Sequence, residues 1–168
     1  MKPKTVGRVT GGQYRPENAQ NLCHGFPVGL PIATADGERP VETLSDGDMI
    51  VTRNGGLTRV EAIHAITETT RAIRFSAGCL DPGAPIRDLV LPADQPVLVR
   101  DRRALALFGQ VQAMTVAGQL VDGDLIADIG PRRLVLFRLT FDRPRVIRAG
   151  GLELGASHDA NLPRRAVA

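Results

Sequence analysis

Aromatic residues are scarce in this sequence. It contains no Trp, one Tyr and five Phe among 168 residues, so we expect a core of aliphatic side chains. A chain of this length can bury one sizeable core but is too short for two ordinary domains. The same scarcity removes the stacking platform on which single-stranded nucleic acids are usually bound.

Cysteine is equally rare, and long apolar runs are missing. Cys23 and Cys79 are too few for a disulfide framework, and Cys79 has no His or Cys at zinc-ligand spacing. No N-terminal segment combines a charged start with a continuous apolar region, and no apolar run is long enough to span a membrane. We therefore expect a soluble, cytoplasmic protein with no membrane partner, no metal and no cofactor.

The charge balance excludes few classes of binding partner. Net charge is +3, and 19 of the 21 basic residues are Arg. Arginine-rich faces can bind nucleic acid or an acidic partner, and such binding depends strongly on salt. The residues that could form such a face are Arg100, Arg102, Arg103, Arg132, Arg133 and Arg143.

Turn-forming residues are plentiful. Eighteen Gly and 12 Pro interrupt the chain at short intervals, which is typical of an all-β domain of many short strands. We expect a flexible arm over 1–22, one β domain over 23–155 and a flexible tail over 156–168. A short helix or turn is expected over 102–109. The expected strands cover 31–34, 48–53, 58–66, 71–76, 97–100, 111–116, 124–129, 134–142 and 144–148.

One phrase occurs twice. Residues 44–50 read LSDGDMI and residues 120–126 read LVDGDLI, 76 positions later (120 minus 44). The repeat predicts two related halves. Gly suits a tight turn, the Asp before it can accept a hydrogen bond from an amide two residues on, and the Leu can enter the core. Neither copy has the alternating oxygen ligands of a calcium loop, so we interpret both as turns.

The segment from Ile32 to Asp48, IATADGERPVETLSDGD, resembles the opening block of the Hint fold, which hedgehog autoprocessing domains and inteins share. The bacterial Hint branch is the nearest in pattern, and the resemblance extends over roughly 25–155. It implies a pseudo-two-fold, β-rich horseshoe or disc, in agreement with the internal repeat. It also implies self-cleavage, in which a Cys attacks the preceding carbonyl while a His protonates the leaving nitrogen.

This sequence departs from the family pattern at the positions that carry that chemistry. Gly25 stands where the family has its nucleophilic Cys, and Gln95 stands where it has its His. A further His that often follows Asp-Arg is replaced in Asp142-Arg143-Pro144. Gln cannot shuttle a proton near neutral pH. The resemblance therefore predicts a pseudoenzyme, a non-catalytic Hint domain that acts as an interaction or assembly module for another protein.

Two alternatives stay open. Cys23-His24 lies two residues before the expected nucleophile and could cleave the Leu22–Cys23 bond through a thioester, although neighbouring side chains of an extended segment face opposite ways. The second alternative is that arginine side chains bind nucleic acid or an acidic partner. We interpret His64 as an ordinary strand residue, and the His158-Asp159 pair as solvated.

Overall fold

The computed structural model describes residues 24–53, 56–80 and 83–156. Strands dominate them, which confirms the predicted all-β class. The first sheet has four strands, in the order β1 (Phe26–Pro27), β10 (Ile126–Thr140), β6 (Ala62–Phe75) and β7 (Leu89–Pro92). The second has β5 (Leu57–Arg59), β4 (Met49–Val51), β2 (Pro31–Thr34), β11 (Arg145–Ala149), β12 (Leu152–Ala156), β8 (Pro96–Val99) and β9 (Ala113–Val116) in order, with β3 (Gly37–Pro40) beside β2.

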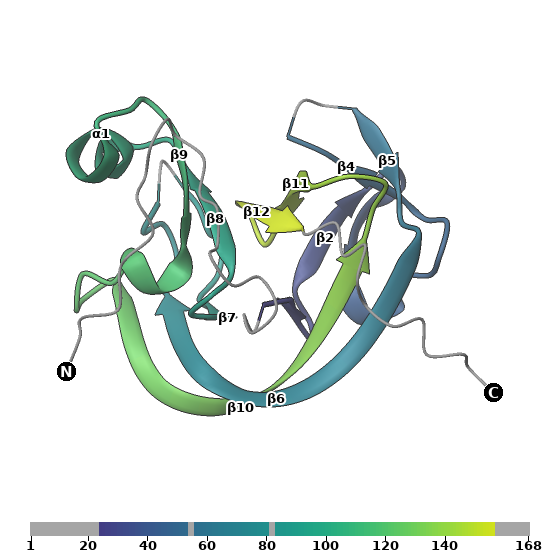
Figure 1. Ribbon diagram of the computed structural model, residues 1–168, viewed down its shortest axis with the longest axis horizontal. Coiled ribbons are helices and arrows are strands. Elements are labelled where there is room, and N and C mark those ends of the chain that lie inside the picture. Colours follow the sequence, from purple (N-terminus) through teal and green to yellow (C-terminus); the bar gives the residue numbers. More distant parts are fainter. Residues whose placement is uncertain (1–23, 54–55, 81–82, 157–168) are drawn as a thin grey trace.

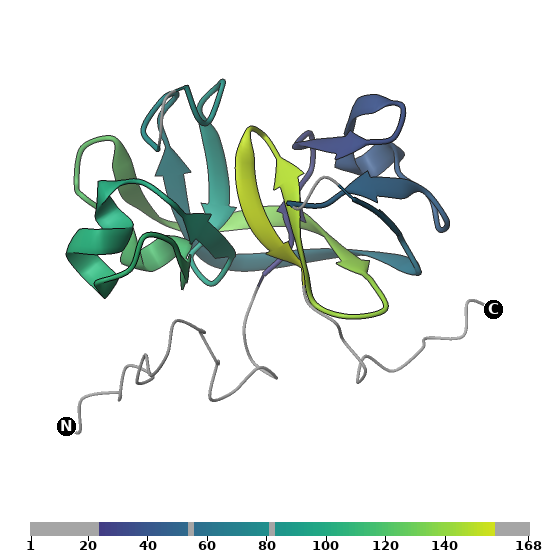
Figure 2. The ribbon, with the colours of Figure 1, turned by 90° about the horizontal axis from the view of Figure 1, so that it is seen from above.

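The two longest strands hold the molecule together. β6 and β10 form an antiparallel ribbon, from Ile126 opposite Phe75 to Thr140 opposite Ala62, with a bulge between Asp128 and Pro131. Figure 1 shows this ribbon curving beneath two groups of shorter strands, with β11 and β12 between them. Figure 2, turned by 90°, shows the shorter strands standing on the ribbon.

The sequence analysis divided both long strands, and that was wrong. It predicted breaks at 67–70 and 130–133, where the side chains are polar or the chain contains Gly and Pro. The middle of the ribbon has mostly exposed side chains, so these positions need no apolar alternation. The predicted strand over 58–66 is also interrupted, because Val60 turns inward between β5 and β6 and is fully buried.

Four strands were not predicted, namely β1, β3, β7 and β12. β3 contains Gly, Pro and two charged residues, a composition that is depleted in strands and tolerated at a sheet edge. β12 contains Gly155, and it ends at Ala156, which we had placed in the tail. The expected hairpin does form, because β4 pairs with β5. Its Asn54-Gly55 turn, the expected arm and the rest of the expected tail lie outside the described residues.

The two copies of the repeated phrase hold equivalent places in the fold, but their turns are hydrogen-bonded differently. Each copy follows a short 3-10 helix, η2 (Val41–Thr43) or η3 (Ala117–Gln119), and each runs into a strand, β4 or β10. Leu44 and Leu120 are buried beneath the turns, as predicted. The halves differ where the first has a tight turn between β2 and β3 and the second inserts helix α1 (Arg102–Phe108) between β8 and β9.

An aspartate organises each of the two turns. The Asp48 carboxylate accepts a hydrogen bond from Ser45 N at 2.8 Å, whereas that of Asp122 accepts from Asp124 N and Ile126 N, both at 2.9 Å. The i+2 bond predicted for the Asp before Gly is thus formed in the second copy. Among the described residues, no group of three or more His, Cys, Asp or Glu could hold a metal ion.

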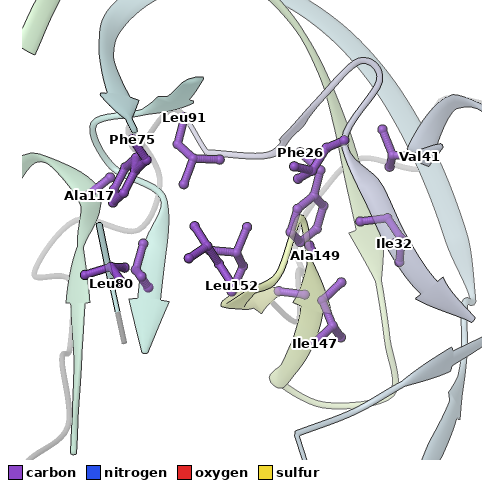
Figure 3. Close-up of a cluster of buried hydrophobic side chains, with 14 of the residues drawn as sticks. Phe26, Ile32, Val41, Phe75, Leu80, Leu91, Ala117, Ile147, Ala149 and Leu152 are labelled. Carbon is purple, nitrogen blue, oxygen red and sulfur yellow. The ribbon is translucent and has the colours of Figure 1, made fainter. Parts of the chain in front are cut away.

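The core lies between the two groups of strands and the ribbon. Figure 3 shows Leu152 between a cluster that contains Phe75 and Leu91 and another that contains Phe26 and Ile147. All five are buried. Aliphatic side chains predominate, but three of the five phenylalanines are fully buried, so the expectation of an aliphatic core was only partly right. No helix in the described part of the chain is long and apolar enough to cross a membrane.

Candidate functional site

The structure brings together the two positions that the sequence analysis singled out. Gly25 directly precedes β1, and Gln95 lies in the turn between β7 and β8. They are 70 positions apart in sequence, yet Gly25 N donates a hydrogen bond of 3.1 Å to Gln95 Oε1. β1 reaches this place because Phe26 and Pro27 pair with Phe137 and Leu136 of β10.

Gln95 is fully buried, and its amide is occupied with backbone groups. Its Nε2 donates to Gly155 O at 2.9 Å and to Pro96 O at 3.1 Å, while Oε1 accepts from Gly25. Both amide hydrogens and the carbonyl therefore have partners, as a buried amide requires. The side chain connects the start of the described chain to its last strand, and has no free polar atom with which to act on a substrate.

Gly25 has no room for a side chain. A Cβ at this position would lie 3.0 Å from Leu136 Cβ and 3.3 Å from Phe137 O, closer than ordinary van der Waals contact. The backbone φ of Gly25 is +153°, which L-residues with a Cβ rarely adopt. The strand that would carry a nucleophile is thus packed against β10 at the point where the nucleophile would project.

Little space remains beside these two residues. The adjoining cavity measures about 10 Å³, enough for about one water molecule. Arg138 closes one side, and its Nε donates a hydrogen bond of 3.2 Å to His24 O. The lining residues are His24, Gly25, Phe26, Gln95, Arg138, Leu139, Thr140, Gly155 and Ala156.

The third position without a family histidine lies away from this cavity. Asp142-Arg143-Pro144 forms the exposed turn between β10 and β11. Arg145 pairs with Asp142 at 2.9 Å, and this hydrogen bond holds the pKa of the carboxyl below its ordinary range. Residues 142–144 therefore form a surface turn and do not line the cavity beside Gln95.

Within the described ranges, the other histidines and cysteines form no metal-binding group. His24 is half-buried, but Cys23 lies outside the described residues, so the Cys23-His24 dyad stays a prediction. His64 is a strand residue of β6 opposite Arg138, as interpreted from the sequence. Cys79 is buried, and burial raises the pKa of its thiol. The His158-Asp159 pair lies outside the described residues.

The six arginines of the nucleic-acid hypothesis lie in three separate places. Three lie in or next to α1, two lie in the middle of β10, and Arg143 follows the end of that strand. Figure 1 shows α1 and the middle of β10 far apart. Arg100 pairs with Glu153, and Arg103 pairs with Asp101 at 2.6 Å. Two of the six guanidinium groups therefore already have carboxylate partners.

Sequence reasoning found Gly25 and Gln95 but missed Arg138 and Gly155. Arg138 donates a hydrogen bond to the carbonyl oxygen of His24. The carbonyl oxygen of Gly155 accepts a hydrogen bond from Gln95 Nε2. No motif marks either residue. Gly155 lies in a strand that was not predicted, and Arg138 is one of many arginines along the chain.

Comparisons with known proteins concern the family and the fold of this chain. A family model described as "Hint domain" matches residues 24–161. The bacterial intein-like domain from Clostridium thermocellum is similar in structure, with a TM-score of 0.54 and 14% identity over 81% of this chain and all of that one. No curated protein matched the sequence.

Two inteins have the same fold. The gp41-1 intein superposes with a TM-score of 0.52 and 10% identity over 79% of this chain and 98% of that one. A DnaB intein from Synechocystis sp. PCC 6803 superposes with a TM-score of 0.52 and 12% identity, over 80% of this chain and 99% of that one. At such low identity these likenesses concern the fold alone.

Proposed function

Because the chain belongs to the Hint domain family, we propose that it is a member that no longer cleaves itself and that uses the fold to bind another protein. The observation that carries this proposal is the hydrogen bond between Gly25 N and Gln95 Oε1. It joins the two positions at which the family places its nucleophile and its histidine, and neither residue present can perform the corresponding step.

The reaction needs two chemical groups and a space that this site does not offer. An acyl shift requires a thiol or hydroxyl within reach of the preceding carbonyl, and Gly25 has no side chain. It requires an acid for the leaving nitrogen, and the Gln95 amide neither titrates near neutral pH nor has a free hydrogen. It also needs space for a tetrahedral intermediate, and the cavity of about 10 Å³ is too small for one.

A surface feature supports the binding role. Leu105 and Leu107 of α1 and the nearby Val111 are 64%, 56% and 83% exposed. Within α1 itself only Ala104 is buried. These exposed apolar side chains are close in sequence, and exposed apolar surface is a feature of protein interaction sites.

Intact-mass spectrometry of the full chain, with and without added thiol or hydroxylamine, tests the loss of chemistry. We expect the full-length mass under all conditions. The wild-type protein and a Cys23→Ala control should behave alike. Loss of the mass of residues 1–22 from the wild type, and not from Cys23→Ala, would show that Cys23 cleaves the Leu22–Cys23 bond and would overturn the proposal.

A further inference from the structure

One face of the second sheet lies away from the core. Ile50, Val97, Ile147 and Leu154 of β4, β8, β11 and β12 are fully buried and form the core side. Successive side chains of a strand point to opposite faces, so the residues between them form an outer face. We call it the arginine face, and it contains Arg53, Leu98, Arg100, Met114, Arg148 and Glu153.

Three guanidinium groups share one carboxylate on this face. Arg100 pairs with Glu153, and Arg53 Nε lies 3.8 Å from Glu153 Oε2. Arg148 lies directly opposite Glu153 across the antiparallel pair of β11 and β12. It is exposed, and among the described residues no carboxylate lies within 4 Å of its guanidinium group. The face therefore has an excess of two positive charges (3 minus 1).

Neighbouring carboxylates do not cancel this excess. Glu153 is the only acidic residue of β4, β8, β11 and β12. Asp101, which follows Arg100, pairs with Arg103 at 2.6 Å. Glu38 lies on β3, beyond β2. Even if Glu38 is counted, one positive charge remains (3 minus 2).

Apolar side chains lie beside the arginines. Leu98 and Met114 are directly opposite each other on β8 and β9, and both are half-buried. Val111, just before β9, is 83% exposed. None of β4, β8, β9, β11 and β12 contains an aromatic residue on which a base could stack. The face thus suits a polypeptide with acidic and apolar side chains better than a single-stranded nucleic acid.

We propose that the arginine face binds an acidic, extended segment of a partner protein. Complementary charge selects such a segment and speeds its association. β8 and β11 lie two strands apart, about 10 Å, and alternate residues of an extended segment lie about 7 Å apart on one side. The long side chains of Arg100 and Arg148 can therefore meet neighbouring carboxylates of the same segment. A further carboxylate competes with Glu153 for Arg53.

This inference rests on the part of the proposed function that concerns binding, and it adds a surface and the charge of the partner. Of the three arginines, only Arg100 was singled out from the sequence. Self-cleavage is decided separately by intact mass, so the two ideas can fail independently.

Fluorescence anisotropy of the full chain with a labelled synthetic peptide of alternating Glu and Val tests the proposal. We expect binding that weakens as salt is added, because the attraction is between charges near the surface. A peptide with Gln in place of every Glu should not bind. A labelled single-stranded DNA of similar length should bind more weakly than the acidic peptide.

Matched variants separate this face from the charge of the protein as a whole. Arg148→Gln should weaken peptide binding about tenfold. Arg148→Lys, which keeps the charge, should restore most of it. Arg133→Gln, at an exposed position in the middle of β10, removes the same charge and should change the affinity less than about twofold. Circular dichroism checks that each variant is folded.

Three results would overturn the proposal. Equal weakening by Arg148→Gln and Arg133→Gln would mean that net charge alone attracts the peptide. DNA that binds more tightly than the peptide, and is lost with Arg148→Gln, would assign the face to nucleic acid. Absence of peptide binding would overturn the inference, and the loss of self-cleavage would keep its own test.

Discussion

At the scale of single residues, the site depends on the absence of a side chain at Gly25. A glycine lets β1 lie against Leu136 and Phe137 of β10 without a clash, and leaves its N–H directed at Gln95. In the family pattern this position carries the reactive side chain. Here the same position makes a close contact with β10, at Leu136 Cβ and Phe137 O.

Gly25→Ala should lower the free energy of unfolding by about 2 to 4 kcal/mol, because the added Cβ meets the backbone of β10 and the φ of +153° is strained for alanine. Denaturant unfolding followed by circular dichroism measures this loss.

Gly29→Ala is the matched control. Gly29 also has a positive φ, +85°, but nothing lies within 4 Å of an added Cβ. We expect a loss of about 1 kcal/mol, from backbone strain alone. Equal losses at the two positions would show that β1 and β10 can move apart, and that the nucleophile's position is not closed.

At the scale of elements, local signals explain some segments and not others. α1 has both of its end signals in the sequence. Asp101 Oδ1 accepts a hydrogen bond from Arg103 N at 2.9 Å, and Gly109 follows the helix in the left-handed conformation. β6 and β10, by contrast, are continuous only because each pairs with the other along nearly its whole length.

Asp101→Ala should cost about 1 kcal/mol of stability, since it removes the N-cap of α1. Asp101→Asn keeps an oxygen acceptor and loses the ion pair with Arg103, whose side chain is 28% exposed, so it should cost less. Thermal unfolding of the three proteins ranks them. If Asn were as damaging as Ala, the ion pair rather than the cap would hold the helix.

At the scale of the whole molecule, the halves are interlocked. β1 of the first half pairs with β10 of the second, and β7 of the second pairs with β6 of the first. β11 joins both groups of strands, through β2 on one side and β12 on the other. Neither half can unfold without breaking the sheet of the other, so we expect a single cooperative transition.

Gln95→Leu tests this cooperativity. The change leaves Gly25 N–H and Gly155 C=O buried without partners, which should cost about 3 kcal/mol. Native-state hydrogen exchange should report the same loss at the slowest amides of β2 and β8. A loss confined to β8 would show that the halves unfold separately. Glu68→Leu, on an exposed side chain in the middle of β6, is the control and should change little.

The sequence by itself determined the fold class and the internal repeat, and it led to the prediction that Gly25 and Gln95 stand at the family's reactive positions. These are local properties. Turn residues recur at short intervals, both copies of the repeated phrase have a buried leucine and a positive-φ glycine, and the side chain at each position can be read directly from the residue.

Only the tertiary structure decided the rest. The length of β6 and β10 depends on pairing between residues up to 78 positions apart (140 minus 62), which no local pattern encodes. The same holds for the contact between Gly25 and Gln95. The pairing of β1 with β10 and of β7 with β6, and not local propensity, places these two residues side by side.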